Sequence, residues 1–516
     1  MSEKKPVILI EMRPTLDGFA GIPQETRLLF RGLSLVDSIE VEGLLQTSLR
    51  PLASGTKPDQ QVKDSDDEAE RLGLYSNLLI SITDKPSKKL ASEIARLANK
   101  TWSIYMLLFK TLIFRKIRKV KTTLFDPKFF EDFVWQTFFS KTLPSSDYPI
   151  VTRKKYRVVK TPWNSFQTVG LSSLKFSAKA AYPFLDTRGA EVFIAQTPYP
   201  GRVTKGTSLV VRYHDALPIF MPHLFANKTR HHAGHFHALT SNVKNGAYFA
   251  CVSESTRQDL LRIAPELKDR AVTIPNMVSH HFFPDESPAD RPVKIVRARL
   301  NLENAEACPT FSNLSEQREF YEEHLKQTPF KYLLMVSTIE PRKNHTRLIS
   351  AFEALRAELD PTLKLIVVGS FGWDVDPIVK EMRTWIDQGA LFVLHKVPAA
   401  DLRVLYRHAE ATVCPSIAEG FDFSGIESMR SGGIAVASDI PVHREIYDDG
   451  SLYFDPYNTE SLVDQLKVVM TGNDAGATKQ RLRERGQQVS ARYLPEAVLP
   501  LWRKFLHSVI EAKSSS

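Results

Sequence analysis

The stretch Pro415-Ser-Ile-Ala-Glu-Gly-Phe-Asp-Phe-Ser-Gly-Ile-Glu-Ser-Met-Arg-Ser-Gly-Gly433 decides the fold class of this chain. It separates two short apolar runs, 411–414 and 434–437, which we predict to be buried parallel strands. Ser424-Gly-Ile-Glu427 has the S-x-x-E pattern of a capping box, so a helix is predicted to begin near Ser424. A helix that follows a strand presents free N–H groups and a positive dipole end, which together form an anion site.

A second motif of the same kind lies upstream. Val336-Ser-Thr-Ile-Glu-Pro-Arg-Lys-Asn-His345 follows the apolar run 333–336 and precedes a helical pattern. Arg342 and Lys343 would then lie at the carboxyl end of a strand, where a guanidinium fork and an ammonium group can hold phosphate oxygens. Taken singly, Glu427 of the first motif is explained by helix capping and Glu419 by an exposed loop.

Together the two motifs resemble those of GT-B glycosyltransferases of the retaining family 4, also called group 1. The resemblance covers about residues 205–512 and, more thinly, 7–45. It implies an α/β fold with two Rossmann-like, doubly wound domains that face a cleft, and a helical insertion in the first domain. The implied divisions are 1–286 for the acceptor-binding domain with its insertion at about 50–190, 287–330 for a linker, 331–490 for the nucleotide-sugar-binding domain, and 491–516 for a terminal helix that crosses back.

The resemblance also implies the residues of the site. His214-Asp215 closes the predicted strand 209–213 and is similar to a His-Asp segment beside the transferred sugar, although a structural role is the alternative. The implied catalytic residues are His214, Glu419, Arg342 and Lys343. The implied donor-binding residues are Gly18, Gly21, Arg342, Lys343, Glu419, Gly420, Phe421, Ser424, Gly425, Ile426 and Glu427. The implied acceptor-side residues are Asp215, His231 and His235.

One position departs from the family pattern. The family has Glu-Gly-Phe-Gly, whereas this chain has Glu419-Gly-Phe-Asp422. The carboxylate of Asp422 either selects a different sugar or caps the following helix in place of Ser424, and the donor sugar is left open.

Neither a metal nor a cofactor is expected. His231 and His235 share one helical face, which a metal could use, but no Cys, Asp or Glu in that segment completes a site. The three cysteines, too scattered for a disulfide framework, suit a reducing cytoplasm. We find neither a signal peptide nor a membrane-spanning run. The net charge of +9 is local, since seven Lys or Arg and no acid fall within 100–121, which argues against a nucleic-acid-binding surface.

The segment 100–140 has the composition of a peripheral membrane contact. The apolar run 102–114 leads directly into the basic run 115–121, as in helices that lie in a membrane interface. The alternatives are an inserted helical subdomain that covers the first domain's core, or an oligomer surface.

The function that these motifs imply is a metal-independent, retaining transferase of the hexosyltransferase type. It would move a sugar from a nucleotide sugar to a glycan or lipid-linked saccharide in bacterial surface polysaccharide synthesis, in the cytoplasm or at the inner face of its membrane. A nucleotide-sugar epimerase on the same fold and a non-catalytic, glycan-binding scaffold are the alternatives.

Overall fold

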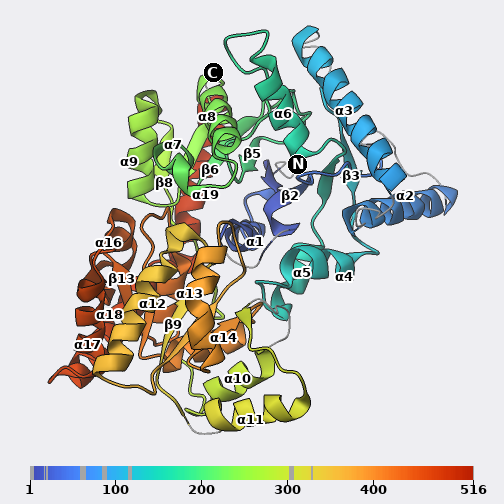
Figure 1. Cartoon of the computed structure of the whole chain (residues 1–516). Coiled ribbons are helices and arrows are strands. Elements are labelled where there is room, and N and C mark those ends of the chain that lie inside the picture. The colour runs from blue at the N-terminus through green and yellow to red at the C-terminus, as the bar shows by residue number, and fades with distance from the viewer. Residues whose placement is uncertain are drawn as a thin grey trace.

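The computed structural model describes residues 5–16, 18, 21–57, 65–83, 90–113, 119–300, 307–326 and 329–514. These residues form two α/β domains, one above the other in Figure 1, each built on its own sheet. A cavity lined by residues of both domains lies between them. The predicted fold class, two Rossmann-like domains that face a cleft, is confirmed.

The first sheet has the strand order β3-β4-β2-β1-β5-β6-β7-β8. All neighbours are parallel except β3 and β4. Successive residues of β1 point to opposite hydrophobic clusters, with Ile8 and Ile10 on one face and Leu9 on the other, so helices cover both faces. The strands are β1 Val7–Glu11, β2 Glu40–Leu45, β3 Thr122–Phe125, β4 Tyr156–Val159, β5 Val192–Ala195, β6 Ser208–Tyr213, β7 Tyr248–Cys251 and β8 Ala271–Thr273.

The predicted helical insertion at about 50–190 is only partly helical. It contributes β3 and β4 to the sheet, which the sequence pattern did not predict because polar residues interrupt both strands, Thr-Thr-Leu-Phe and Tyr-Arg-Val-Val, so that neither forms an apolar run. The helices of the first domain are α1 Ile22–Ser34, α2 Ser65–Thr83, α3 Leu90–Ile113, α4 Glu131–Val134, α5 Tyr148–Thr152, α6 Trp163–Ser173, α7 Leu217–Phe220, α8 Lys228–Lys244 and α9 Glu254–Ile263.

The second sheet has the order β11-β10-β9-β12-β13-β14 and is wholly parallel. Every strand lies where an apolar run predicts one: β9 Tyr332–Val336, β10 Lys364–Val368, β11 Leu391–Leu394, β12 Ala411–Cys414, β13 Ala435–Ser438 and β14 Ser451–Phe454. The helices are α12 His345–Glu358, α13 Asp376–Asp387, α14 Ala399–His408, α15 Phe423–Arg430, α16 Pro441–Tyr447, α17 Thr459–Met470 and α18 Ala475–Ala491.

Two segments connect the domains. The expected linker, 287–330, contains α10 Arg291–Arg299 and α11 Leu314–His324, and Val293 and Val296 of α10 are buried in a cluster of the second domain. The last helix, α19 Pro495–Ser514, runs back to the first domain, where Trp502 is fully buried. Figure 1 shows α19 in red beside the green and blue elements of that domain.

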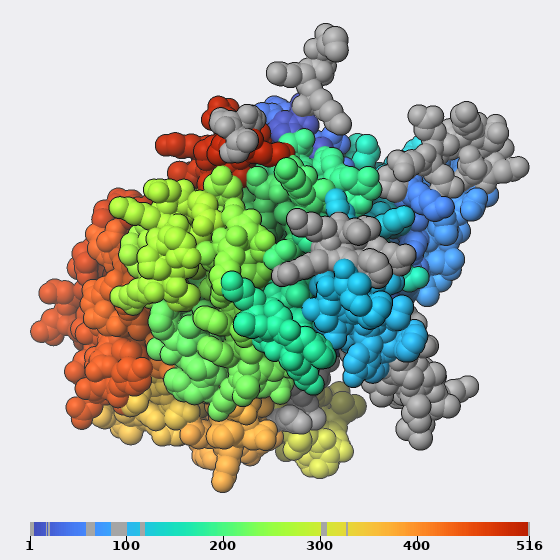
Figure 2. All heavy atoms as spheres, turned by 90° about the horizontal axis from the view of Figure 1, so that it is seen from above, coloured from blue at the N-terminus to red at the C-terminus, as the bar shows by residue number. Residues whose placement is uncertain are grey.

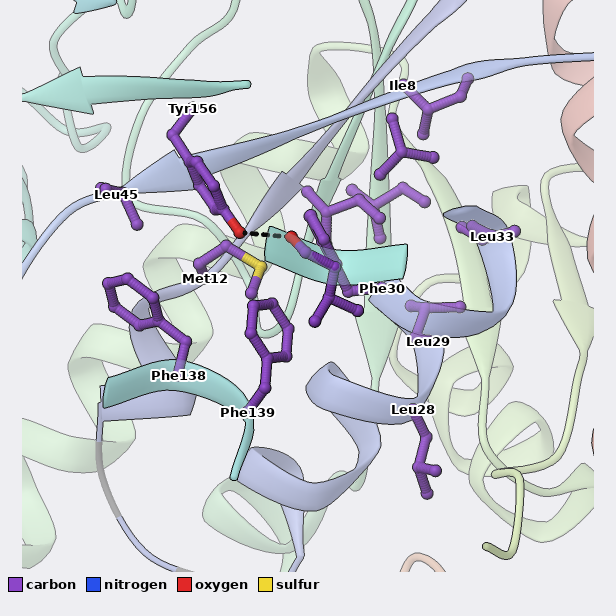
Figure 3. Close-up of a cluster of buried hydrophobic side chains, with 14 of the residues drawn as sticks. Ile8, Met12, Leu28, Leu29, Phe30, Leu33, Leu45, Phe138, Phe139 and Tyr156 are labelled. Atoms are coloured by element: carbon purple, nitrogen blue, oxygen red, sulfur yellow. Dashed lines mark hydrogen bonds between the residues drawn. The ribbon is translucent and has the colours of Figure 1, made fainter. Parts of the chain in front are cut away.

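The segment 100–140 is partly buried in the first domain's core and partly exposed. Phe138 and Phe139 are buried against Phe30 of α1 and Tyr156 of β4, whose hydroxyl donates to the Val151 carbonyl at 3.1 Å (Figure 3). This aromatic part is therefore core, whereas α3 keeps several exposed apolar side chains. Among the described helices, none is both long enough and apolar enough to cross a bilayer. Arg115, Lys116 and Arg118, which belong to the basic run 115–121, lie outside the described residues.

Candidate active site

A cavity of about 260 Å³ lies between the domains, at the carboxyl ends of β6, β9 and β12. Ligands of open α/β sheets bind at this edge because the loops there converge. The cavity collects most of the predicted site residues from sequence positions far apart: Gly21, His214, Asp215, Arg342, Lys343, Glu419, Gly420, Phe421, Ser424 and Glu427.

Arg342 and Lys343 form a cationic pair on one wall of the cavity. Arg342 pairs with Glu340 and with Glu419, both at 2.8 Å, and Lys343 pairs with the other oxygen of Glu419. Although burial by itself lowers the pKa of Arg342, Glu419 and Glu340 raise it overall. Burial opposes ionisation of Glu419 too, but Arg342 and Lys343 hold its pKa below the ordinary value. This wall therefore stays charged at neutral pH.

The loop that carries this pair is held rigidly. Asn344, in the left-handed region at φ 60°, ends the short 3₁₀ turn Pro341–Lys343 and begins α12. Its side-chain amide donates to the Pro415 and Pro456 carbonyls at 3.1 and 2.9 Å. Asn tolerates this conformation better than most residues, and its amide fixes the loop to the ends of neighbouring segments. The two cations are thus positioned before any ligand arrives.

The prediction that Ser424 caps the helix after β12 is wrong. Asp422 is the N-cap of α15, and its Oδ1 accepts from the Ser424 backbone at 3.0 Å and from the Ser424 hydroxyl at 2.7 Å. Its Oδ2 lies 3.4 Å from the buried His443. A carboxylate two residues nearer the amino end is the better placed acceptor for these N–H groups. Asp422, which stands where the family has glycine, therefore acts as the N-cap of α15.

Side chains engage two of the N–H groups at the start of α15. Ser424 donates to Asp422, and Gly425 donates to the Tyr447 hydroxyl at 3.3 Å. Ile426 is fully buried and, like Gly425, does not line the cavity. The anion-binding role predicted for Gly425 and Ile426 is therefore not supported by the geometry, because side chains of the domain's own core satisfy this helix end.

Glu427 is held from both domains. Its Oε1 accepts from Gln24 of α1 at 2.7 Å, and its Oε2 accepts from the Tyr406 hydroxyl at 3.0 Å. Burial raises the pKa of Glu427 to about 7, although these two hydrogen bonds oppose the shift. Glu427 thus lines the cavity as a carboxyl group that titrates near neutral pH.

His214 and Asp215 lie on the opposite wall, where β6 ends. Burial lowers the pKa of His214 to about 3, so the imidazole is neutral, and in the described part of the chain its Nε2 has no hydrogen-bond partner. Burial also raises the pKa of Asp215, against the opposing charge of Arg342. A Cβ on Gly420 would lie 1.7 Å from the His214 carbonyl oxygen, so only glycine allows the two domains to approach this closely.

A second cavity, of about 400 Å³, shares His214 and Asp215 with the first. It contains the predicted acceptor-side residues His231 and His235, together with Trp163 of α6, whose indole N–H has no partner among the described residues. Burial lowers the pKa of His235 to about 3, so this ring is neutral as well. The surfaces of the cavity are aromatic and polar, with few charges.

An aromatic stack closes the space beside this second cavity. His231 stacks on Phe225 with ring centroids 4.9 Å apart, and Phe225 stacks on Trp373 of the second domain at 5.9 Å. The Trp373 indole donates to the Leu224 carbonyl at 2.8 Å. Within the described residues, no group of three His, Cys, Asp or Glu side chains could hold a metal ion.

Sequence reasoning missed several residues of the site. Gln24, Tyr406 and Asn276 contact or line the donor-side cavity from helices and loops that carry no recognisable motif. Conversely, Gly18 is not among the lining residues, and its carbonyl accepts from the buried Arg27 at 3.0 Å. Only the packing of α1 against the second domain brings Gln24 to Glu427, so no local signal could have revealed it.

Comparison with known proteins agrees with this geometry. Residues 316–489 match the family described as glycosyl transferases group 1. The O-antigen chain mannosyltransferase B of Escherichia coli is 26% identical over 225 residues, which cover 44% of this chain and 52% of the relative. The serotype-specific mannosyltransferase WbdA of Escherichia coli is 34% identical over 122 residues, which cover 23% of this chain and 15% of the relative. The chain thus spans about half, or less, of the length of these curated relatives.

The fold has solved counterparts over its whole length. A sucrose-phosphate synthase from Thermosynechococcus elongatus aligns with a TM-score of 0.56 and 13% identity, covering 99% of this chain and 100% of that chain. At this identity the likeness concerns the fold alone. Residues 316–489 thus match the glycosyl transferases group 1 family, and the two facing domains have a GT-B fold.

Proposed function

We propose that the chain transfers a hexose from a nucleotide sugar to a saccharide acceptor, with retention of anomeric configuration and without a metal ion. The observation that carries the proposal is the half-buried, charged pair of Arg342 and Lys343, which lines a cavity between the domains together with His214 and Glu427. Mannose is the first candidate sugar, because both relatives are named as mannosyltransferases, one of them of an O-antigen chain.

The chemistry follows from what each group can do. When the bond between the anomeric carbon and the leaving diphosphate breaks, negative charge develops on the phosphate oxygens, and Arg342 and Lys343 stabilise it in a site that excludes water. Glu419 bridges these two cations and offsets their mutual repulsion before the donor binds, and it would then contact the donor sugar. Glu427 would accept or donate hydrogen bonds to the ribose hydroxyls.

The acceptor would enter from the second cavity. Its hydroxyl attacks from the same face as the departing phosphate, which takes the proton, so no side-chain nucleophile is needed. His214 is neutral at physiological pH and can donate one hydrogen bond to the sugar between the two cavities. The few charges around Trp163, His231 and His235 suit a neutral saccharide, and aromatic rings pack well on sugar faces.

We further propose that the acceptor is a growing, lipid-linked surface glycan and that the protein works in the cytoplasm. The name of the O-antigen chain mannosyltransferase B supports a growing surface glycan as the acceptor. All three cysteines are free and buried, as suits a reducing compartment.

The test is a donor panel. The purified protein is incubated with GDP-mannose, UDP-glucose, UDP-galactose or UDP-N-acetylglucosamine, with and without mannose-containing oligosaccharides, and the products are resolved by mass spectrometry and proton NMR. We expect an α-linked product from an α-donor, and only with an acceptor present. An epimerised donor without acceptor would replace the proposal by the epimerase alternative, and binding without turnover of any donor would support a non-catalytic scaffold.

A further inference from the structure

Over residues 101–113, whose side chains the structure describes, the helix α3 has two apolar faces: one packs on the first domain and the other is largely exposed. Leu108 and Thr111 are buried and Leu107 packs on the first domain's core. On the other side, Trp102 is 69% exposed, Phe109 53% and Ile113 59%.

The exposed residues form one continuous stripe. Trp102, Tyr105, Phe109 and Ile113 are separated by three or four positions, which is the spacing of neighbours along one helical face. The alternative that the sequence offered is a helical subdomain that covers the first domain's core. This role explains the buried face of α3 but not the exposed stripe. Figure 2 shows this part of the chain, in blue, on the outer surface of the first domain.

A basic cleft lies along the flank of α3, where Lys110 lines it and is the i−3 neighbour of Ile113 in the stripe. It has a volume of about 620 Å³ and is lined by Lys110 of α3, by Lys119 and Lys121 of the segment that leads into β3, and by Arg188. Asp186, an acid in its lining, is paired with Arg188 at 2.7 Å. The three lysines therefore give the cleft a net positive charge, and its size admits a phosphate-bearing headgroup.

We propose that the α3 stripe and this cleft form a docking surface for a lipid bilayer that contains anionic headgroups. Trp and Tyr side chains prefer the boundary between acyl chains and headgroups, where the ring is buried and its polar atom stays wet. Lysines beside such rings add attraction to anionic lipid phosphates. A protein partner would be served by the apolar stripe alone, whereas the adjacent cationic cleft matches a phosphate-rich surface.

The docking surface lies close to the second cavity. α3 packs on α6, and Trp163, Asn164 and Gln167 of α6 line that cavity. Figure 1 places α3 and α6 side by side at the edge of the first domain, away from the second sheet. A docked bilayer would thus lie one helix away from the cavity proposed for the acceptor and would leave the second domain free to bind the donor. The docking itself requires neither donor nor acceptor, so it stands apart from the proposed function.

Vesicle sedimentation tests the proposal with the full-length protein. Vesicles of phosphatidylcholine alone are compared with vesicles that contain phosphatidylglycerol, at low and high salt. We expect pelleting only with the anionic vesicles, and weaker pelleting as salt screens the attraction. The triple variant K110Q, K119Q and K121Q should lower partitioning by about 100-fold, since each basic residue near the surface contributes roughly fivefold. The double variant W102S and F109S should lower it through lost apolar burial.

Matched controls keep the result specific. K244Q, K268Q and K504Q remove the same charge from exposed lysines elsewhere, and L314S with Y457S remove exposed apolar side chains elsewhere. Both control variants should pellet like the wild type. Equal pelleting with neutral and anionic vesicles, pelleting with neither, or equal losses in the controls would overturn the proposal. A stripe variant that changes the oligomeric mass in analytical ultracentrifugation but not vesicle binding would replace it by a contact between protein chains.

Discussion

The Gln24 side-chain amide donates a hydrogen bond of 2.7 Å to Glu427 across the interdomain cleft. The carboxyl group expected to bind the donor's ribose is therefore occupied by a residue of the opposite domain. The same closed contact recurs nearby, where the Ser253 hydroxyl donates to the Gly420 carbonyl at 2.8 Å. If Glu427 binds the nucleotide as proposed, donor binding would exchange the Gln24 hydrogen bond for one to the nucleotide and would thereby remove a contact between the two domains.

Replacement of Glu427 by Gln should change how stability depends on pH. Burial raises the pKa of Glu427 from an ordinary value of 4.5 to about 7. Between these values the folded protein binds a proton that the unfolded chain does not, so the free energy of unfolding falls as pH rises through this window. The free energy of unfolding falls by at most about 3 kcal/mol across this window, because a shift of one pKa unit corresponds to about 1.36 kcal/mol. E427Q lacks the titrating group and should lose this slope.

Urea unfolding of the wild type and E427Q at pH 5 and pH 8 measures the difference. Glu25, whose pKa burial also raises to about 7, contributes to both proteins and cancels in the comparison. We expect E427Q to gain stability relative to the wild type at pH 8. Parallel pH profiles would show that Glu427 does not titrate in this range.

Removal of either cation should impair turnover. Arg342→Ala or Lys343→Ala should lower kcat/KM by at least about 100-fold, roughly 2.7 kcal/mol, because the charge that develops on the leaving phosphate loses a partner. Arg481→Ala and Lys380→Ala, both at exposed positions of the second domain, serve as matched controls. Circular dichroism checks folding, since Arg342→Ala also leaves Glu340 without its ion-pair partner and Glu419 with Lys343 alone. Wild-type turnover in a folded variant would remove the cation from the mechanism.

Transfer should survive chelation. Arg342 and Lys343 supply positive charge where other transferases place a divalent ion, so initial rates with and without EDTA should agree. Magnesium or manganese added after EDTA provides the control. If EDTA abolished transfer and the ion restored it, the metal-free assignment would fail.

Asp422 should act through stability and not through donor choice. Both of its oxygens are engaged, Oδ1 by Ser424 and Oδ2 by His443. Asp422→Ala removes the cap of α15 and should cost about 1 kcal/mol, whereas Asp422→Asn keeps the capping oxygen and should cost less. Thermal unfolding measures the cost, and relative rates with the donor panel should stay unchanged. A switch of preferred sugar in a stable Asn variant would instead place this side chain against the donor.

The sequence by itself determined the second domain. Its strands are short, apolar and separated by helical patterns, so buried parallel strands are the only arrangement that satisfies their backbones and hides their side chains. The motifs around Arg342 and Glu419 follow such strands, and parallel strands bring their carboxyl ends to one edge. Local pattern thus placed these residues in one cleft without knowledge of the packing.

Only the tertiary structure decided what these residues contact. β3 and β4 carry polar residues that leave no apolar run to recognise, and β3 is held by pairing with β4 and by the burial of Phe125. Asp422 displaces Ser424 as a cap because the path of the backbone before α15 puts its oxygen nearer the free N–H groups. Gln24 reaches Glu427, and α3 keeps one apolar face exposed, through the way whole elements pack on one another. Such contacts join residues distant in sequence, and local periodicity carries no information about them.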